Sequence, residues 1–483
     1  MDSILSKTKL IGLVVGPALF CLVYFGVVPG VLSEKSIVVL ALGAWMVTWW
    51  VTEAMPIPVT ALMPMIIFPL LGVSTVREAS APYGDPVIFL FMGGFILALG
   101  LERHNLHQRI ALNLIKLTGT SGNGIIMGFM LSTALISMWI SNTATAIMML
   151  PIASSVTALL AKEAGQENDP RFQKFATGLM LGIAYSASIG GLATIIGTPP
   201  NVVMVGYMKR FYNLDVSFTK WMIVGIPLML AILGSCYFII TRILFRNNLP
   251  SIQGSKELIQ RKLNELGKIS REEKFVLAVF SVTCFLWIFR QNLNGLIGKN
   301  LLDDTTIAMA GGVIMFLIPI DLKEQKFLLD WSDMKELPWG ILLLFGGGLC
   351  VADGMEKSGL VQIVGNYFSG QQGINPGVLT FSLTAISMGL TELMSNVALV
   401  TIFVPVVFGI ADGFHINPIW LAMPVTFAAS CAFMMPISTP PNAVLFATGY
   451  IKMKEMIKTG FLLNLFSLVI ITILALTLVQ WIF

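Results

Sequence analysis

The hydrophobic pattern of the chain is a long series of apolar segments separated by short polar ones. Eleven segments have about the length that crosses a bilayer as a helix. They lie near 10–29, 36–53, 56–73, 86–102, 175–197, 221–245, 275–290, 305–320, 338–355, 418–437 and 460–483. Their number and length predict an all-α polytopic membrane protein with about eleven transmembrane helices.

Two further uncharged stretches, 117–161 and 375–411, do not fit as single spans. The first has no Asp, Glu, Lys or Arg over 45 residues, yet Ser141-Asn142-Thr143 interrupts its middle. An unpartnered amide or hydroxyl in hydrocarbon costs a few kcal/mol per group, so such a cluster should be well satisfied or absent. Each stretch therefore predicts a re-entrant hairpin, about 123–160 and about 375–411, with a tip that protein or a water-filled cavity surrounds.

Composition agrees with a membrane protein. Hydrophobic residues make up 56% of the chain and charged residues 12%, whereas soluble domains carry about 25% charged residues. The five cysteines lie singly in apolar stretches, without the spacing of a disulfide framework or a metal site. The net charge of +4 comes mainly from loops between spans, so no nucleic-acid partner is expected.

The distribution of Lys and Arg predicts how the chain lies in the membrane. With the N-terminus in the cytoplasm, 22 of the 30 Lys and Arg fall on the cytoplasmic side, seven of them in a polar linker at 246–274. The positive-inside rule favours this orientation, and eleven spans then leave the C-terminus outside. The segment near 10–29 is too long for the core of a signal peptide, so we expect an uncleaved first span.

Two halves of the chain resemble each other. FMGGFILALGLERHNL (91–106) matches FGGGLCVADGMEKSGL (345–360) at an offset of 254 residues, and Thr198-Pro-Pro-Asn201 matches Thr439-Pro-Pro-Asn442 at an offset of 241. An odd number of spans in each half makes the halves inverted copies. The expected organisation is a span outside the repeat (1–35), a first repeat (36–245), the linker (246–274) and a second repeat (275–483).

An amphipathic segment follows each of the two matched Gly-rich spans. Apolar residues recur at helical spacing within 103–118 and within 356–371. We expect both segments to lie along the membrane surface. The alternative is that they are ordinary loop helices.

Four polar motifs interrupt the apolar pattern, two in each half. Ser141-Asn142-Thr143 and Ser395-Asn396-Val397 lie at the expected hairpin tips, whereas 197–201 and 438–442 carry double prolines that unwind a helix. Unwound carbonyls coordinate cations, and the amides at the start of a helix attract anions. Broken elements from two inverted repeats are typical of a transporter that binds its substrate near the membrane midplane.

Fixed charge is scarce around these motifs. Residues 117–161 contain none, and residues 358–451 contain only Glu392 and Asp412. A bound anion would therefore be balanced by helix ends and by bound cations, which makes sodium a physical expectation. Glu392 is either a cation or proton site or a group paired across the bundle, and Asp353, inside an apolar span, is either a functional acid or a structurally paired one.

No enzyme motif accompanies the polar residues. The chain has no HExxH, no Walker-type glycine-lysine loop and no plausible Ser/His/Asp set. We therefore expect that the protein is not an enzyme.

The chain resembles the divalent anion/sodium symporter family, which includes the INDY-type dicarboxylate transporters. Five motifs carry the resemblance in the family's order: TEAMPIPVTALMP (52–64), SNTATAIMMLPI (141–152), AYSASIGGLATIIGTPPN (184–201), TELMSNVALVTIFVP (391–405) and STPPN (438–442). The resemblance implies an eleven-span homodimer in which a transport domain moves like an elevator against a dimerising scaffold. It also implies a location in a bacterial plasma membrane, with lipid around the protein.

The resemblance further implies ligands for two sodium ions and for the substrate. The first sodium site would use Ser137, Ser141, Asn142 and a carbonyl near Gly197, and the second would use Thr391, Asn396 and carbonyls near Met394 and Ser438. Substrate carboxylates would meet Ser141, Asn142, Thr143, Thr198, Ser395, Asn396, Thr439 and Pro440, with Val397 at the second tip. Sodium is the implied coupling ion, and no organic cofactor is implied.

Val397 departs from the Ser-Asn-Thr that many dicarboxylate transporters of the family carry at both tips. The missing hydroxyl removes one hydrogen-bond donor to a carboxylate, worth about 1.5–3 kcal/mol when the partner is charged. The C4-dicarboxylates succinate, fumarate and malate are our first expectation, with citrate and sulfate as alternatives. A sodium symporter is favoured over a dicarboxylate exchanger because both expected cation sites are intact, and a channel with re-entrant loops is a further alternative.

Overall fold

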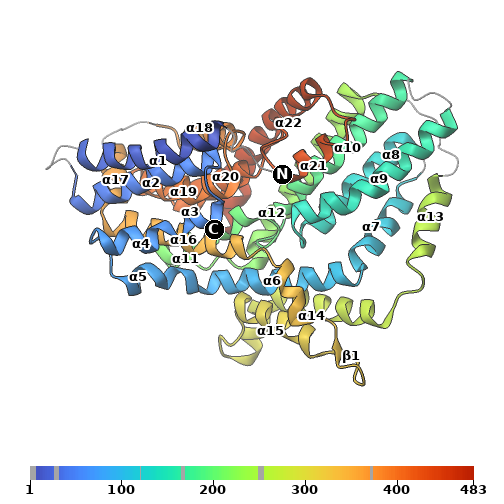
Figure 1. Cartoon of the computed structure of the whole chain (residues 1–483), viewed down its shortest axis with the longest axis horizontal. Helices are drawn as coiled ribbons and strands as arrows, with labels where there is room; N and C mark the ends of the chain where they lie inside the picture. Colours follow the sequence, from blue (N-terminus) through green and yellow to red (C-terminus); the bar gives the residue numbers. More distant parts are fainter. Residues whose placement is uncertain (1–6, 27–31, 120, 165–168, 248–254, 370–373) are drawn as a thin grey trace.

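Helices dominate the computed structural model, which describes residues 7–26, 32–119, 121–164, 169–247, 255–369 and 374–483 (Figure 1). The first half of the chain contains α1 (Lys7–Gly26), α2 (Glu34–Thr52), α3 (Ile57–Ala61), α4 (Met63–Leu70), α5 (Val76–Ser80), η1 (Ala81–Gly84), α6 (Pro86–Arg103), α7 (Leu106–Leu117), α8 (Gly122–Ser137), α9 (Asn142–Ala164), α10 (Pro170–Gly191), α11 (Pro199–Tyr212), α12 (Phe218–Phe238) and the π-helix η2 (Ile239–Leu244).

The second half has a similar order of elements. It contains α13 (Ser255–Glu265), α14 (Arg271–Ile297), α15 (Asp304–Leu317), β1 (Pro319–Asp321), β2 (Lys326–Phe327), η3 (Trp331–Glu336), α16 (Trp339–Lys357), α17 (Leu360–Ser369), α18 (Pro376–Thr391), α19 (Asn396–Gly413), α20 (Pro418–Ala429), α21 (Pro440–Phe446), α22 (Met453–Leu474), the π-helix η4 (Ala475–Val479) and α23 (Gln480–Ile482).

Eight helical segments in the described part of the chain are long and apolar enough to cross a membrane. Every one of the eleven expected spans overlaps a helix, although the number of crossings stays a prediction. Several of these helices expose large apolar side chains, such as Val282 (57% exposed) and Phe285 (51%) on α14. Outward apolar side chains at this density suit a lipid environment, so the protein is a multi-pass integral membrane protein.

The boundaries of the helices repeat at the offset found in the sequence. α8 and α9 begin at residues 122 and 142, and α18 and α19 begin 254 residues later, at 376 and 396. The turns before α7 and α17 also match, because Asn105 (φ 55°) and Gly359 (φ 83°) both adopt the left-handed conformation that these residue types tolerate best. The same sequence signals therefore build the same local structure twice.

Part of the polar linker between the two halves is helical. It contains the helix α13, on which Leu258, Ile259 and Leu263 recur at helical spacing and are buried. α13 packs against α7, and Lys116 Nζ donates a hydrogen bond to Gln260 Oε1 at 2.8 Å. Figure 1 shows α7 and α13 together at one end of the long axis, beside α8 and α9.

The all-α prediction is wrong at one place. β1 and β2 form a short antiparallel pair after α15. Pro319 cannot continue the helix, because proline has no backbone N–H to donate to a helical carbonyl. A reverse turn after β1 then folds the chain back on itself. The pair lies at the edge of the molecule, below α14 in Figure 1, and does not reach the polar motifs.

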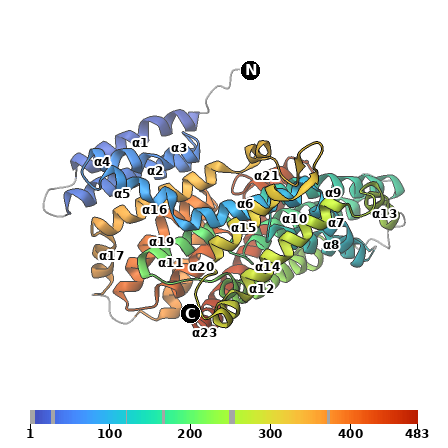
Figure 2. The same cartoon turned by 90° about the horizontal axis from the view of Figure 1, so that it is seen from below.

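The four elements with polar motifs interlock at the centre of the molecule. α10 packs against α8 and α9, and α20 packs against α18 and α19. α11, the helix after the first break, packs against α19 of the other half, while α21 packs against α9. Figure 2 shows α11, α19 and α20 as neighbours, and α9, α10 and α21 as a second group toward the other end of the long axis. This crossed packing joins the two halves of the chain.

Candidate functional site

The turn between α8 and α9 carries the first Ser-Asn-Thr motif. α8 ends at Ser137, α9 begins at Asn142, and Ser141 Oγ accepts a hydrogen bond from Ala144 N at 3.1 Å. Ser141 therefore caps α9, whose positive end lies at the turn. An anion at this turn would meet backbone amides instead of a Lys or Arg side chain.

Four oxygen atoms meet beneath this turn, and we call Ser137 Oγ, Asn142 Oδ1, Ala187 O and Gly197 O the first oxygen cluster. Ser137 Oγ lies 2.7 Å from Asn142 Oδ1 and 2.6 Å from Ala187 O. Asn142 Oδ1 also lies 3.0 Å from Ala187 O and 3.3 Å from Gly197 O. The single hydroxyl hydrogen cannot serve all these contacts, so either the amide turns its nitrogen inward or a cation binds among the oxygens.

The turn between α18 and α19 repeats this arrangement, and we call Thr391 Oγ1, Asn396 Oδ1 and Ala429 O the second oxygen cluster. Thr391 Oγ1 donates toward Asn396 Oδ1 at 2.9 Å and toward Ala429 O. Ser395 lies at the start of α19, where the first turn has Ser141. A hydroxyl, an amide oxygen and a carbonyl therefore converge twice in the molecule, with the hydroxyl and the amide at matched positions.

Two asparagines hold the broken helices open. Both are fully buried, and each donates two hydrogen bonds across the break that precedes its own helix. The bonds run from Asn201 Nδ2 to Gly191 O (3.0 Å) and Thr194 O (2.8 Å), and from Asn442 Nδ2 to Ala432 O (3.0 Å) and Met435 O (3.1 Å). These bonds satisfy backbone carbonyls at or just after the end of the preceding helix, where helical partners are missing.

Gly191 makes room for the first oxygen cluster. A Cβ atom on this residue would lie 2.9 Å from both Asn142 Oδ1 and Gly197 O, closer than side-chain carbons normally approach. Ala432 holds the matched position in the second break. The first cluster therefore tolerates no side chain where the second already has one.

The residues expected to contact substrate carboxylates surround the same turns and breaks. Thr198 and Thr439 cap α11 and α21 and are buried. Thr439 Oγ1 accepts from Asn442 N, whereas the Thr198 hydroxyl makes no capping bond. The remaining residues are half-buried or exposed: Ser141, Asn142, Thr143, Ser395, Asn396, Val397 and Pro440. Met394 is half-buried and packs against the hydrophobic core, and Ser438 directs its hydroxyl to Glu392.

Both acids singled out in the sequence have protein partners. Glu392 accepts hydrogen bonds from the second break and from Asn464. Asp353 forms a two-point ion pair with Arg210, which also lies 3.5 Å from Asp85. Among the described residues there is also no group of three or more His, Cys, Asp or Glu that could hold a metal ion. The two oxygen clusters themselves consist of neutral oxygen atoms.

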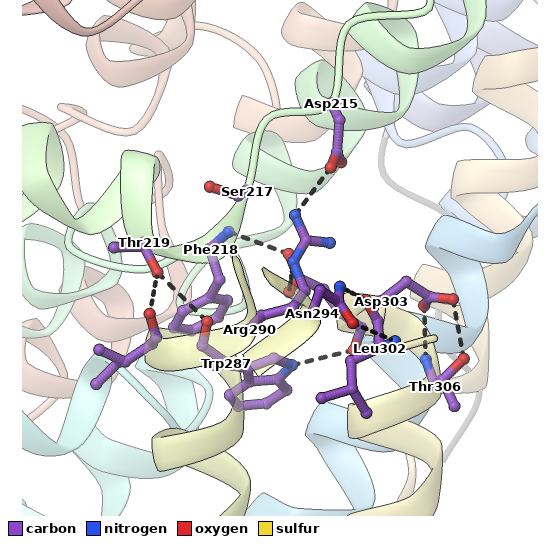
Figure 3. A network of polar contacts seen from close by, with 12 residues as sticks. Asp215, Ser217, Phe218, Thr219, Trp287, Arg290, Asn294, Leu302, Asp303 and Thr306 are labelled. Atoms are coloured by element: carbon purple, nitrogen blue, oxygen red, sulfur yellow. Dashed lines mark hydrogen bonds and ion pairs between the residues drawn. The ribbon is translucent and has the colours of Figure 1, made fainter. Parts of the chain in front are cut away.

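An aromatic stack supports the first turn from the side. The Trp139 ring stacks on Phe218 (centroids 6.1 Å apart) and meets Phe280 edge-on (5.1 Å), and Phe218 stacks on Trp287 of α14 (4.6 Å). The start of α12 is also tied to α14, where Thr219 Oγ1 donates to Ile288 O at 2.9 Å (Figure 3). The first turn is thus connected to a long lipid-facing helix.

Ion pairs complete this connection. Arg290, whose side chain is 8% exposed, pairs with Asp215 at 2.8 Å and with Asp304 at 3.4 Å. Phe218 N donates to Asp304 Oδ2 at 3.0 Å, and Trp287 Nε1 donates to Asp304 O at 3.0 Å. Figure 3 shows Arg290 directed at Asp215, with Asn294 holding Leu302 and Asp303 holding Thr306 nearby.

Residues 7–483 match the family described as "Sodium:sulfate symporter transmembrane region". This chain belongs to that family. The family resemblance of the sequence is thereby confirmed, and the family is one of transporters, not enzymes.

Curated relatives of the family align along almost the whole chain. The sodium-dependent dicarboxylate transporter SdcS of Staphylococcus saprophyticus is 42% identical over 472 residues, which are 96% of this chain and 90% of the relative. The protein of the same name from Staphylococcus aureus (strain USA300) is 40% identical over 476 residues, with the same coverage.

Two solved transporters share the fold at low sequence identity. The Alcanivorax borkumensis YdaH transporter superposes with a TM-score of 0.55 and 14% identity over 87% of this chain and 89% of its own. Neisseria gonorrhoeae MtrF superposes with a TM-score of 0.56 and 15% identity over 85% of this chain and 83% of its own. Both comparisons concern the fold alone.

The family motifs contain part of the site but not all of it. Asn201 and Asn442 lie inside the quoted motifs, but the motifs alone indicate no role for either residue. The carbonyls of Ala187 and Ala429 carry no signal of their own, because every residue type has one. Gly191 follows another glycine in a small-residue stretch, which is the signal that a backbone approaches closely there.

Proposed function

We propose that this chain is a sodium-coupled symporter of a small divalent anion, with the C4-dicarboxylates succinate, fumarate and malate as its substrates. The observation that carries the proposal is the pair of oxygen clusters, each beside the start of a helix and without a hydrogen bond from a Lys or Arg side chain of the described residues. The 40–42% identity to transporters named sodium-dependent dicarboxylate transporters supports the choice of ion and substrate class.

Sodium ions in the two clusters supply the positive charge that the substrate needs. The first ion would bind Ser137, Asn142 and the carbonyls of Ala187 and Gly197, with Ser141 nearby. The second would bind Thr391, Asn396 and the carbonyls of Ala429, Met394 and Ser438. Each Asn side chain then lies between a cation and the anion, so that binding of one favours binding of the other.

The charge balance predicts a dependence on membrane potential. Three or more sodium ions with one dianion move net positive charge inward, and an inside-negative potential assists each charge by about 2.3 kcal/mol per 100 mV. Orientation with the N-terminus in the cytoplasm and the C-terminus outside is part of this proposal and is supported by the bias of Lys and Arg.

The movement that we propose is an elevator, in which the interlocked hairpins and broken helices move together as one unit. The crossed packing of α9 with α21 and of α11 with α19 supports a single moving body. α7 and α17, each preceded by a left-handed residue, would be the arms that connect it to a scaffold. We also propose a homodimer, which light scattering of the purified protein in detergent would test.

Uptake of radiolabelled succinate into proteoliposomes tests the function. We expect saturable uptake that requires sodium, is accelerated by an inside-negative potential and is inhibited by fumarate and malate more strongly than by citrate or sulfate. Stronger inhibition by citrate or sulfate would reassign the substrate. Uptake that persists without sodium but requires internal dicarboxylate would instead make the protein an exchanger, and single-channel conductance would make it a channel.

A further inference from the structure

A buried carboxylate lies beside the second oxygen cluster. Glu392 follows Thr391 directly, is 7% exposed, and accepts hydrogen bonds from the backbone amides of residues 433–435 at 2.9–3.3 Å. Ser438 Oγ donates to the same carboxylate at 2.9 Å, and Asn464 Nδ2 donates at 2.8 Å. One side chain of the turn therefore holds the unwound stretch between α20 and α21 together with α22.

The first half of the chain makes this connection differently. The offset of 254 residues places Met138 where the second half has Glu392. There, Thr194 Oγ1 donates a single hydrogen bond to the main-chain carbonyl of Met138. The first turn is therefore tied to its break by one neutral bond, and the second by a carboxylate with five neighbouring donor groups.

The negative charge of Glu392 is not cancelled by a neighbour. All the groups that donate to it are neutral amides or a hydroxyl, and no described Lys, Arg or His forms an ion pair with it. Charges interact strongly at short range where water is excluded. A cation in the second oxygen cluster would lie beside Thr391, so it would feel this charge directly, whereas the first cluster has no such acid.

We propose that Glu392 is a positioning residue that sets the sodium affinity of the second oxygen cluster. It fixes Thr391 and Ser438 relative to each other and adds a negative charge next to the ion. The second cluster then binds sodium at lower concentration than the first, and the first is completed when substrate joins it. The inference rests on the proposed function and goes beyond it by ranking the two sites.

The test compares Glu392→Gln with Glu273→Gln in proteoliposome uptake. Gln keeps the size of the side chain but removes the charge. Glu273 is a second buried glutamate (4% exposed), and its ion-pair partner is Arg109 on α7. We expect Glu392→Gln to raise the sodium concentration for half-maximal uptake about tenfold, while the succinate KM at saturating sodium stays within twofold. Glu273→Gln should leave the sodium requirement unchanged.

An unchanged sodium requirement in well-folded Glu392→Gln protein would overturn the inference, as would a fall in kcat alone. If this variant is not monodisperse in detergent, Asn464→Ala replaces it, because that change keeps the charge of Glu392 and removes one of its hydrogen-bond donors. We then expect the sodium concentration for half-maximal uptake to rise about threefold. No rise in this concentration would overturn the inference. Absence of sodium-dependent uptake in the unmodified protein would instead overturn the proposed function itself.

Discussion

The two turns of the molecule share the same kinds of oxygen atoms but have different supports. The first turn is held by an aromatic stack, in which Trp139 contacts Phe218 and Phe280. The second turn has Leu393 at the matched position, 69% exposed, and is held instead by the carboxylate of Glu392. A duplicated site can therefore keep its candidate ligands while each copy acquires a different means of holding them in place.

Removal of a shared ligand should have the largest effect and should affect both halves alike. Asn142→Ala and Asn396→Ala each delete an oxygen that we place between cation and anion, and hydrogen bonds to charged groups are worth about 1.5–3 kcal/mol apiece. We expect each variant to raise both the sodium requirement and the succinate KM, with uptake efficiency lowered about 100-fold. Wild-type affinity for both ligands in either variant would exclude the shared-site arrangement.

Addition of one methyl group should affect the two halves of the site differently. Gly191→Ala would place a carbon 2.9 Å from Asn142 Oδ1 and Gly197 O, and such crowding costs about 1–3 kcal/mol. We expect a rise of about tenfold to 100-fold in the sodium requirement, measured by proteoliposome uptake. Ala432→Gly, the matched change in the second break, should alter the sodium requirement by less than threefold. Equal effects of the two changes would mean that the two clusters leave the same room for a side chain.

The hydroxyl at the third motif position should tune affinity for the substrate. Thr143 supplies it at the first turn, and Val397 leaves it out at the second. We expect Thr143→Val to raise the succinate KM about tenfold, as one lost bond to a carboxylate predicts. Val397→Thr should change the ranking of succinate, citrate and sulfate in a competition assay more than it changes sodium dependence. If Val397→Thr changed the succinate KM more than Thr143→Val did, the carboxylate would lie nearer the second turn.

Much of the fold could be predicted from the sequence because membrane helices have a strong local signal. All eleven expected spans overlap helices, and the offset of 254 residues predicted matched helix starts such as those of α8 and α18. The helix α13 was missed because its few apolar residues sit in a charged linker. The strands β1 and β2 were missed because a hairpin with two residue pairs, Pro319 with Phe327 and Asp321 with Lys326, has too short a pattern to stand out.

The side chains of the candidate site were easier to predict than its backbone and its supports. Ser137 lies beside Asn142 and Thr391 lies beside Asn396 in the structure, whereas their roles as sodium ligands stay a prediction. The partners of Glu392 could not be deduced, because three of them are backbone amides of residues 433–435 whose direction depends on how the break unwinds. Contacts between positions far apart in the chain leave no local pattern.

The aromatic support of the first turn should have the smallest effect among these changes. Trp139→Leu gives the first turn the residue type found at the second, and it removes two aromatic pairs worth about 0.5–1.5 kcal/mol each. We expect the succinate KM to rise about threefold to tenfold with the sodium requirement of the second cluster unaltered. Leu393→Ala is the matched control, and its exposure predicts no change beyond twofold. If Leu393→Ala proved the more damaging, the second turn would be the one that depends on outside contacts, and the aromatic stack would have no part in substrate binding.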